Sequence, residues 1–137
     1  MKTKTETAIG TVPADSFAGV KDWATSIEFA ITYRKGGYGG LDWKFSPRGC
    51  YLKVTPVRHY KLDDGKGGNI AMRESRLGFG PHSGGIVLLE ACDRLAPKRL
   101  ATIAAFASKH LDSIAEAFRD GNPDAMRHAA YPGTPAI

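Results

Sequence analysis

The stretch CYLKVTPVRHYKL, residues 50–62, is the longest run in the chain with the alternation of a β-strand. Successive side chains of a strand point to opposite faces, so the apolar residues Leu52 and Val54 share one face. Tyr51 and Lys53 share the opposite face. The stretch therefore predicts a strand with an apolar face for a core and a polar face that carries an aromatic ring and a positive charge.

Shorter stretches on either side show similar signals. TSIEFAITYRK (25–35) alternates β-branched and aromatic residues with polar ones, which predicts a half-buried strand. Pro56 cannot donate to a strand ladder and indicates an edge or a bulge within the long strand. The predicted strands are 25–35, 41–45, 50–62 and 70–79, with glycine-rich turns at 36–40 and 63–69.

Helical signals dominate the C-terminal part of the chain. Ser83 follows a glycine-rich turn and is the N-cap candidate of a helix over IVLLEACDRL, residues 86–95. Over residues 98–120 apolar side chains recur every three or four positions, which predicts an amphipathic helix. Pro97 either begins this second helix or kinks one continuous helix, and Gly121 ends it.

Strands followed by helices are the order of an α+β fold. We predict a four-stranded antiparallel sheet (a meander) followed by one kinked or two consecutive C-terminal helices packed on one face. The other face of such a sheet is free to meet water or a ligand. The predicted organisation is an N-terminal arm over residues 1–22, a single α+β domain over 23–121, and a C-terminal tail over 122–137 that wraps or frays.

The bulk composition predicts one globular domain: 137 residues, 42% hydrophobic and 24% charged. No apolar run approaches the about 18 to 20 residues that span a bilayer, so no membrane partner is predicted. The N-terminus lacks the apolar core of a signal peptide, which favours a cytoplasmic protein. Without a secretory signal, Cys50 and Cys92 are predicted to be thiols rather than a disulfide.

Positive charge is concentrated in the middle of the chain. The formal net charge is +5, whereas residues 34–76 alone carry ten Lys and Arg against four Asp and Glu. The rest of the chain carries nine basic and ten acidic residues. A field concentrated on one element attracts a polyanion such as nucleic acid. The alternative is a solvated sheet face that is merely rich in Lys and Arg.

No motif predicts catalysis, a metal or a cofactor. The four histidines and two cysteines lack the CxxC, HxxxH and HExxH spacings of zinc sites. GFGPHSGG (78–85) has Ser83 where the dinucleotide-binding fingerprint needs glycine, and it does not fit a nucleophile elbow. It is either a turn capped by Ser83, which is favoured, or a turn whose N–H groups hold one phosphate. Asp63 and Asp64 are predicted to form a turn rather than to bind a cation.

Strand alternation also sorts the side chains of the basic segment. Trp43 and Phe45 share a face and are predicted to lie on the core side. Two tyrosines then remain as candidates to stack on bases, with lysines and arginines to neutralise phosphates and His59 beside them. The predicted nucleic-acid-binding residues are Arg34, Lys35, Tyr38, Lys44, Arg48, Tyr51, Lys53, Arg58 and Lys61.

Two resemblances add to this interpretation. The element order over residues 25–118 resembles the single-stranded DNA-binding folds of the PC4, Whirly and PUR type, which implies a curved sheet with a basic, aromatic face and, as in PC4-like modules, a homodimer. RGCYLKVTPV (48–57) and SGGIVLLEACDRLAPKRL (83–100) resemble segments of small uncharacterised phage and mobile-element proteins, although Cys50 stands where that pattern has an aromatic residue. The second resemblance implies a mobile-element origin, work on nucleic acid in the host cytoplasm, and no catalytic residue.

The sequence thus favours a small, basic, non-enzymatic nucleic-acid-binding protein, with single-stranded DNA preferred. The alternative is a protein-interaction module that inhibits a host defence or transcription complex by binding an acidic or nucleic-acid-handling host protein. An enzyme and a structural part of a virion are lesser alternatives. The two leading hypotheses differ in whether the protein binds oligonucleotides with an affinity that falls steeply as salt rises.

Overall fold

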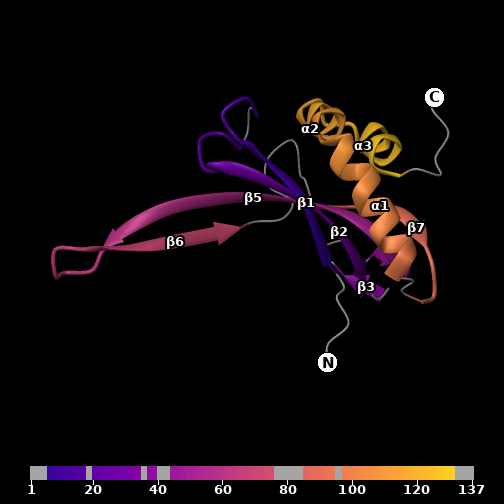
Figure 1. Ribbon diagram of the computed structural model, residues 1–137, viewed down its shortest axis with the longest axis horizontal. Coiled ribbons are helices and arrows are strands. Elements are labelled where there is room, and N and C mark those ends of the chain that lie inside the picture. Colours follow the sequence, from indigo (N-terminus) through magenta and orange to yellow (C-terminus); the bar gives the residue numbers. More distant parts are fainter. Residues whose placement is uncertain are drawn as a thin grey trace.

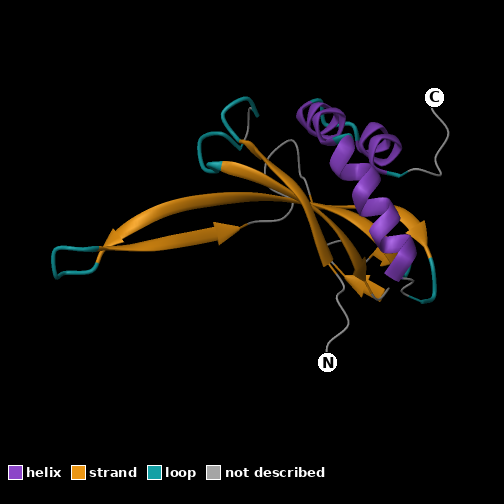
Figure 2. Cartoon of the chain, viewed as in Figure 1, coloured by secondary structure: helices purple, strands orange, loops and turns teal. Residues whose placement is uncertain are grey.

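The computed structural model describes residues 6–17, 20–34, 37–39, 44–75, 85–94 and 97–131. An open antiparallel sheet carries three C-terminal helices on one face (Figures 1 and 2). The predicted α+β class, with an antiparallel sheet first and C-terminal helices packed on it, is confirmed.

Within the described ranges the main sheet has five strands, in the order β1-β2-β5-β6, with β7 also paired to β5. A short hairpin, β3 with β4, lies between β2 and β5 in sequence and forms a separate two-stranded sheet. The strands are β1 (Glu6–Pro13), β2 (Ser26–Arg34), β3 (Gly37–Gly39), β4 (Lys44–Ser46), β5 (Gly49–Asp63), β6 (Asn69–Ser75) and β7 (Gly85–Ala91).

The predicted helix after Ser83 is wrong, because residues 85–91 form strand β7. Ile86 and Val87 are β-branched, and a short run of Ile, Val and Leu is compatible with a buried strand as well as with a helix. The N-terminal half of β5 needs a partner on its second edge, and β7 provides it over residues 49–54. Ser83 itself lies outside the described residues.

Two further element predictions are corrected. The predicted N-terminal arm contains strand β1, which pairs with β2, and it also supplies the buried core residues Phe17 and Val20. Of the predicted strand over 41–45, residues 44 and 45 belong to the short β4, which pairs with β3 outside the main sheet, and residues 41–43 lie outside the described residues. Period-two patterns mark strands but do not say which sheet a strand joins.

The helices are α1 (Pro97–Lys109), α2 (Leu111–Arg119) and α3 (Pro123–Ala130). The single amphipathic helix expected over residues 98–120 is present as two consecutive helices, α1 and α2, which meet at His110. The third helix lies within the predicted tail. Its N-terminus is capped by Asn122, whose side-chain oxygen accepts a hydrogen bond from the Ala125 amide at 3.1 Å, and Pro123 occupies the first turn.

The core lies between the sheet and the helices. Leu52 and Val54 are fully buried there, as the alternation of the long strand predicts. The Phe118 ring of α2 lies 5.5 Å from the Phe17 ring and 6.2 Å from the Phe29 ring of β2. These three aromatic side chains join the N-terminal segment, the sheet and the helices.

Strand β5 is much longer than its neighbours. It pairs with β2 only up to Val57, and from there on it pairs with β6 alone. Residues 58–75 therefore form a two-stranded ribbon, here called the ribbon arm, that projects away from the body of the molecule (Figure 1). The predicted turn at its tip is present: the Asp64 carboxylate accepts hydrogen bonds from the amides of Lys66 and Gly68, which hold the pKa of that carboxyl below its usual range.

Candidate nucleic-acid interface

The sheet face turned away from the helices is here called the open face. Side chains of directly paired residues lie on the same face of a sheet, so the register assigns its members. Lys53 pairs with Ala30 and Ile86, and Thr55 pairs with Glu28. The charged side chains that the register places on it are Glu6, Glu28, Arg34 and Lys53.

Tyr51 lies on the open face as predicted, but it is not available to stack on a base. Its side chain is only 5% exposed, its hydroxyl donates a hydrogen bond to the Pro47 carbonyl, and burial raises the pKa of its hydroxyl. Thr32 and Val57 on the same face are buried as well. Alternation therefore gives the face of a side chain correctly but not its exposure, and the expectation of an exposed Tyr51 is corrected.

Lys53 also points to the open face, where an acidic partner meets it. Its ammonium group lies 3.0 Å from a carboxylate oxygen of Glu6, and 30% of its side chain is exposed. Next to it, the Arg73 guanidinium pairs with the Glu28 carboxylate. The four side chains line a groove of about 510 Å³ over β1, β2, β5 and the end of β6. Both cations of the groove are thus partly neutralised within the chain.

The other predicted residues are spread over separate places. Arg34 is exposed at the end of β2, and Arg48 is exposed just before β5, where its guanidinium lies 3.4 Å from the Asp93 carbonyl. Arg58 and Lys61 lie on the ribbon arm, on opposite faces because their numbers differ by three. The structure thus brings together only part of the predicted set.

Three predicted residues cannot be placed in the same way. Lys35 lies outside the described residues. Tyr38 and Lys44 belong to the β3–β4 hairpin, in which Tyr38 pairs with Phe45 and Lys44 with Gly39, and only its backbone is described. Their roles stay predictions.

Sequence reasoning left out Arg73, a further cation on this surface. Along β5 the face of Lys53 continues to His59 and Lys61, and Arg73 of β6 pairs directly with His59. These four residues, Lys53, His59, Lys61 and Arg73, are here called the cationic row. A symmetric hairpin around the glycine-rich loop pairs position 59 with position 73, so the sequence did hold a signal for Arg73.

A second polar cluster ties the helices to the sheet. Arg99 of α1 lies 3.3 Å from the carboxylate of Glu90 on β7, and the Tyr131 hydroxyl bonds to both. The hydrogen bond from Tyr131 is the main cause that holds the pKa of Glu90 below its usual range. The cluster links α1 and the C-terminal end of α3, in the helical layer, to β7 in the sheet. We therefore assign it to the fold rather than to the interface.

Among the described residues, no three side chains of His, Cys, Asp or Glu gather as a metal site would require. Cys50 and Cys92 are free thiols, as predicted, and burial is the main cause that raises the pKa of Cys50 to about 11. A thiol with so high a pKa is a poor nucleophile at neutral pH. The described helices include none that is long and apolar enough to cross a membrane.

Comparison with protein-family models, with curated proteins and with solved structures finds no match for this chain. The resemblances to PC4-type folds and to phage proteins therefore stay predictions.

Proposed function

We propose that this protein is a non-enzymatic nucleic-acid-binding protein that holds a phosphate backbone along the cationic row. The observation that supports this is the alignment of Lys53, His59 and Lys61 on one face of β5. At about 3.3 Å per residue, this row runs about 26 Å from the body onto the ribbon arm. A nucleic-acid strand carries a phosphate about every 3.4 Å along B-DNA, so the row spans several phosphates.

The preference for single-stranded DNA is a narrower part of the proposal. Non-specific single-strand binders combine a basic groove with exposed aromatic faces. Among the described side chains of the open face, none is an exposed Phe, Tyr or Trp. The preference therefore depends on Tyr38, and the phosphate contact does not.

A first prediction concerns the cationic row. Lys53→Glu combined with Lys61→Glu is expected to weaken oligonucleotide binding by about tenfold or more, because each reversal removes a phosphate contact and adds a repulsion. The measurement is fluorescence anisotropy with labelled single-stranded and duplex DNA at about 50 mM and about 200 mM salt. The salt slope of the double variant should fall by about two, one for each lost lysine.

The matched control for this prediction is Lys98→Glu with Lys109→Glu. Both lysines are exposed on α1, in the helical layer, and the pair makes the same change in net charge. Failure of the natural chain to bind either nucleic acid at low salt would sink the proposed function. An equal loss in both double variants would show that only the net charge matters, not the row.

A second prediction concerns the carboxylates beside the row. Glu6→Gln with Glu28→Gln is expected to raise affinity several-fold, because it releases Lys53 and Arg73 from their ion pairs. Asp112→Asn with Glu116→Gln, two exposed acids of α2, gives the same change in net charge away from the groove. The same anisotropy assay measures both variants. If the Glu6 and Glu28 variant binds oligonucleotides no more tightly than the Asp112 and Glu116 variant, phosphates do not reach this groove.

One observation favours the alternative of a protein-interaction module. Leu62 and Ile70 on the ribbon arm are 47% and 49% exposed, and exposed large apolar side chains that lie together mark protein contacts. Under this alternative the chain binds no oligonucleotide, and its host target stays bound after nuclease treatment of the lysate. The anisotropy assay above separates the two functions.

A further inference from the structure

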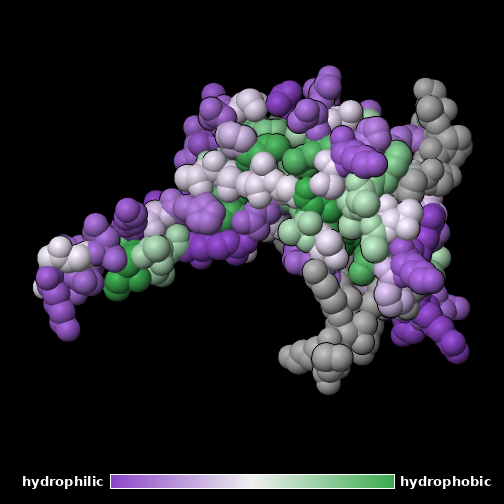
Figure 3. Space-filling view, in the orientation of Figure 1, coloured by the Kyte–Doolittle hydropathy of each residue, from purple (hydrophilic) through white to green (hydrophobic). Residues whose placement is uncertain are grey.

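One face of the ribbon arm carries an exposed apolar area toward its tip, with the charged pair Arg58 and Glu74 on the same face nearer the body. Leu62 pairs directly with Ile70, and Tyr60 pairs with Met72, so these four side chains share one face of the ribbon. Figure 3 shows this hydrophobic area on the arm within a hydrophilic surround. Tyr60 and Leu62 continue the core face of β5, but the helices that cover Leu52 and Val54 do not extend over the arm (Figure 1).

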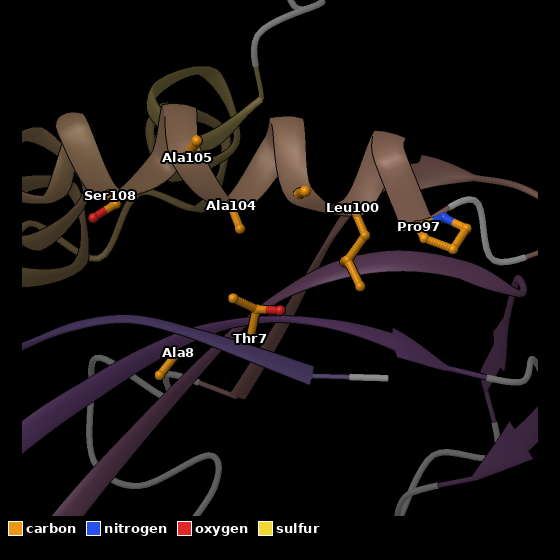
Figure 4. Close-up of a pocket in the computed structure, with 8 residues that line it drawn as sticks. Thr7, Ala8, Pro97, Leu100, Ala104, Ala105 and Ser108 are labelled. Atoms are coloured by element: carbon orange, nitrogen blue, oxygen red, sulfur yellow. The ribbon is translucent and has the colours of Figure 1, made fainter. Parts of the chain in front are cut away.

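A groove that could receive such a face lies at the opposite edge of the sheet, beside β1. It has a volume of about 570 Å³ and runs between β1 and α1 (Figure 4). Leu100 and Ala104 point from the helix toward the strands. Its lining includes Thr7 and Ala8 of β1 and Leu100, Ala101, Ala104 and Ser108 of α1. No charged side chain is among its described lining residues.

The groove follows the outer edge of β1. Thr7 points to the helix side and Ala8 to the open face, and both line the groove. Among the described strands β1 pairs only with β2, so its other edge offers backbone N–H and C=O groups. Helix α1 stays close to this strand, since the Ser108 hydroxyl donates to the Ile9 carbonyl at 3.2 Å. A strand added along this edge would lie with one face against α1.

We propose that the groove of one chain receives the ribbon arm of a second copy, so that two chains exchange arms around a two-fold axis. The apolar face with Leu62 and Ile70 packs against α1, and an edge of the ribbon extends the sheet beyond β1. Because the two copies exchange arms reciprocally, both arms and both grooves are occupied, which closes the assembly at two chains. The chain itself is the occupant because it carries both complementary surfaces.

Physical chemistry gives two reasons for this exchange. An isolated two-stranded ribbon is marginally stable in water, so a long arm needs a surface to pack on. The exchange also covers both the exposed apolar pair and the unpaired strand edge, which are the usual sites of unwanted association. The opposite face of the arm, with His59 and Lys61, stays open in the dimer, so the inference neither needs nor blocks the proposed phosphate contact.

The test is the oligomeric state of the full chain without nucleic acid, measured by sedimentation velocity over a range of concentrations. The natural chain is expected to be a dimer. Leu62→Asp with Ile70→Asp should raise the dimer dissociation constant by about 30-fold or more, as for loss of an interface hot spot. Ala101→Arg changes the groove instead of the arm, on the exposed side of α1, and should also raise the dimer dissociation constant. Ala71→Asp, exposed on the opposite face of the arm, is the control that leaves the dimer intact.

Cross-linking between differently tagged chains tests the geometry. With Cys92→Ser as background, a mixture of Ile70→Cys chains and Ala101→Cys chains is expected to form a disulfide-linked heterodimer under mild oxidation. Ala71→Cys in place of Ile70→Cys should not. A monomeric natural chain, a dimer that both the arm and the groove variants leave intact, or equal cross-linking from position 71 would each overturn the proposal.

Discussion

Truncation of Phe118 to alanine is expected to lower the free energy of unfolding by about 3 to 5 kcal/mol, the usual cost of removing a buried aromatic ring. The side chain is fully buried and belongs to α2. Its ring packs at a tilt against Phe17 and edge-on against Phe29. The cavity would open where three parts of the chain meet, so no single element can close it by a small shift.

Chemical denaturation of Phe118→Ala, followed by circular dichroism, measures this loss. Phe106→Ala is the matched control, because Phe106 is half-buried on α1 and its ring stacks on exposed His110 at 4.4 Å. Its truncation should cost much less than that of Phe118. Phe118→Leu should recover a large part of the loss, since it refills most of the volume. A cost of Phe118→Ala no greater than that of Phe106→Ala would contradict the packing described above.

The fold was largely predictable where one signal decides the structure. Alternation in residues 50–62 assigns the faces of β5 correctly, and three-and-four spacing assigns the buried side of α1 and α2. The apolar run of residues 86–91 does not distinguish a strand from a helix, because it fits a buried strand and a helix equally well. Only the free edge of β5 selects the strand, and that is a long-range property of the sheet.

The candidate site was less predictable, because exposure and pairing depend on neighbours distant in sequence. Tyr51 is on the predicted face yet buried, and Lys53 is on the predicted face yet paired with Glu6, 47 positions away. Arg58 and Lys61 were expected on one face of the sheet but lie on opposite faces of the ribbon arm. The arm exists because β2 ends its pairing at Val57 while β5 continues, and a strand's own sequence does not state where its neighbours stop.

Gly49→Ala is expected to destabilise the protein by about 1 to 3 kcal/mol, the cost of forcing extra atoms into a packed site. An alanine Cβ at this position would overlap the Glu90 carbonyl oxygen and lie 2.8 Å from the Ala91 Cα, both in the backbone of β7. A backbone cannot rotate away as a side chain can, so β7 must separate from β5. The separation also strains the hydrogen bond from the Cys92 amide to the Arg48 carbonyl, which measures 2.9 Å.

The sign of this effect makes it informative. A glycine replaced by alanine where the backbone is compatible gains about 0.4 to 1 kcal/mol from the unfolded chain, so the default expectation is a small stabilisation. Gly67→Ala is the control that distinguishes a steric clash from backbone strain. Nothing lies within 4 Å of a Cβ at this position, but its φ of +86° disfavours alanine. Hydrogen exchange then locates the damage: amides of β7 should lose protection in Gly49→Ala and keep it in Gly67→Ala. A neutral or stabilising Gly49→Ala would mean that β7 does not approach β5 this closely. In that case pairing with β5 would no longer explain why residues 85–91 form a strand.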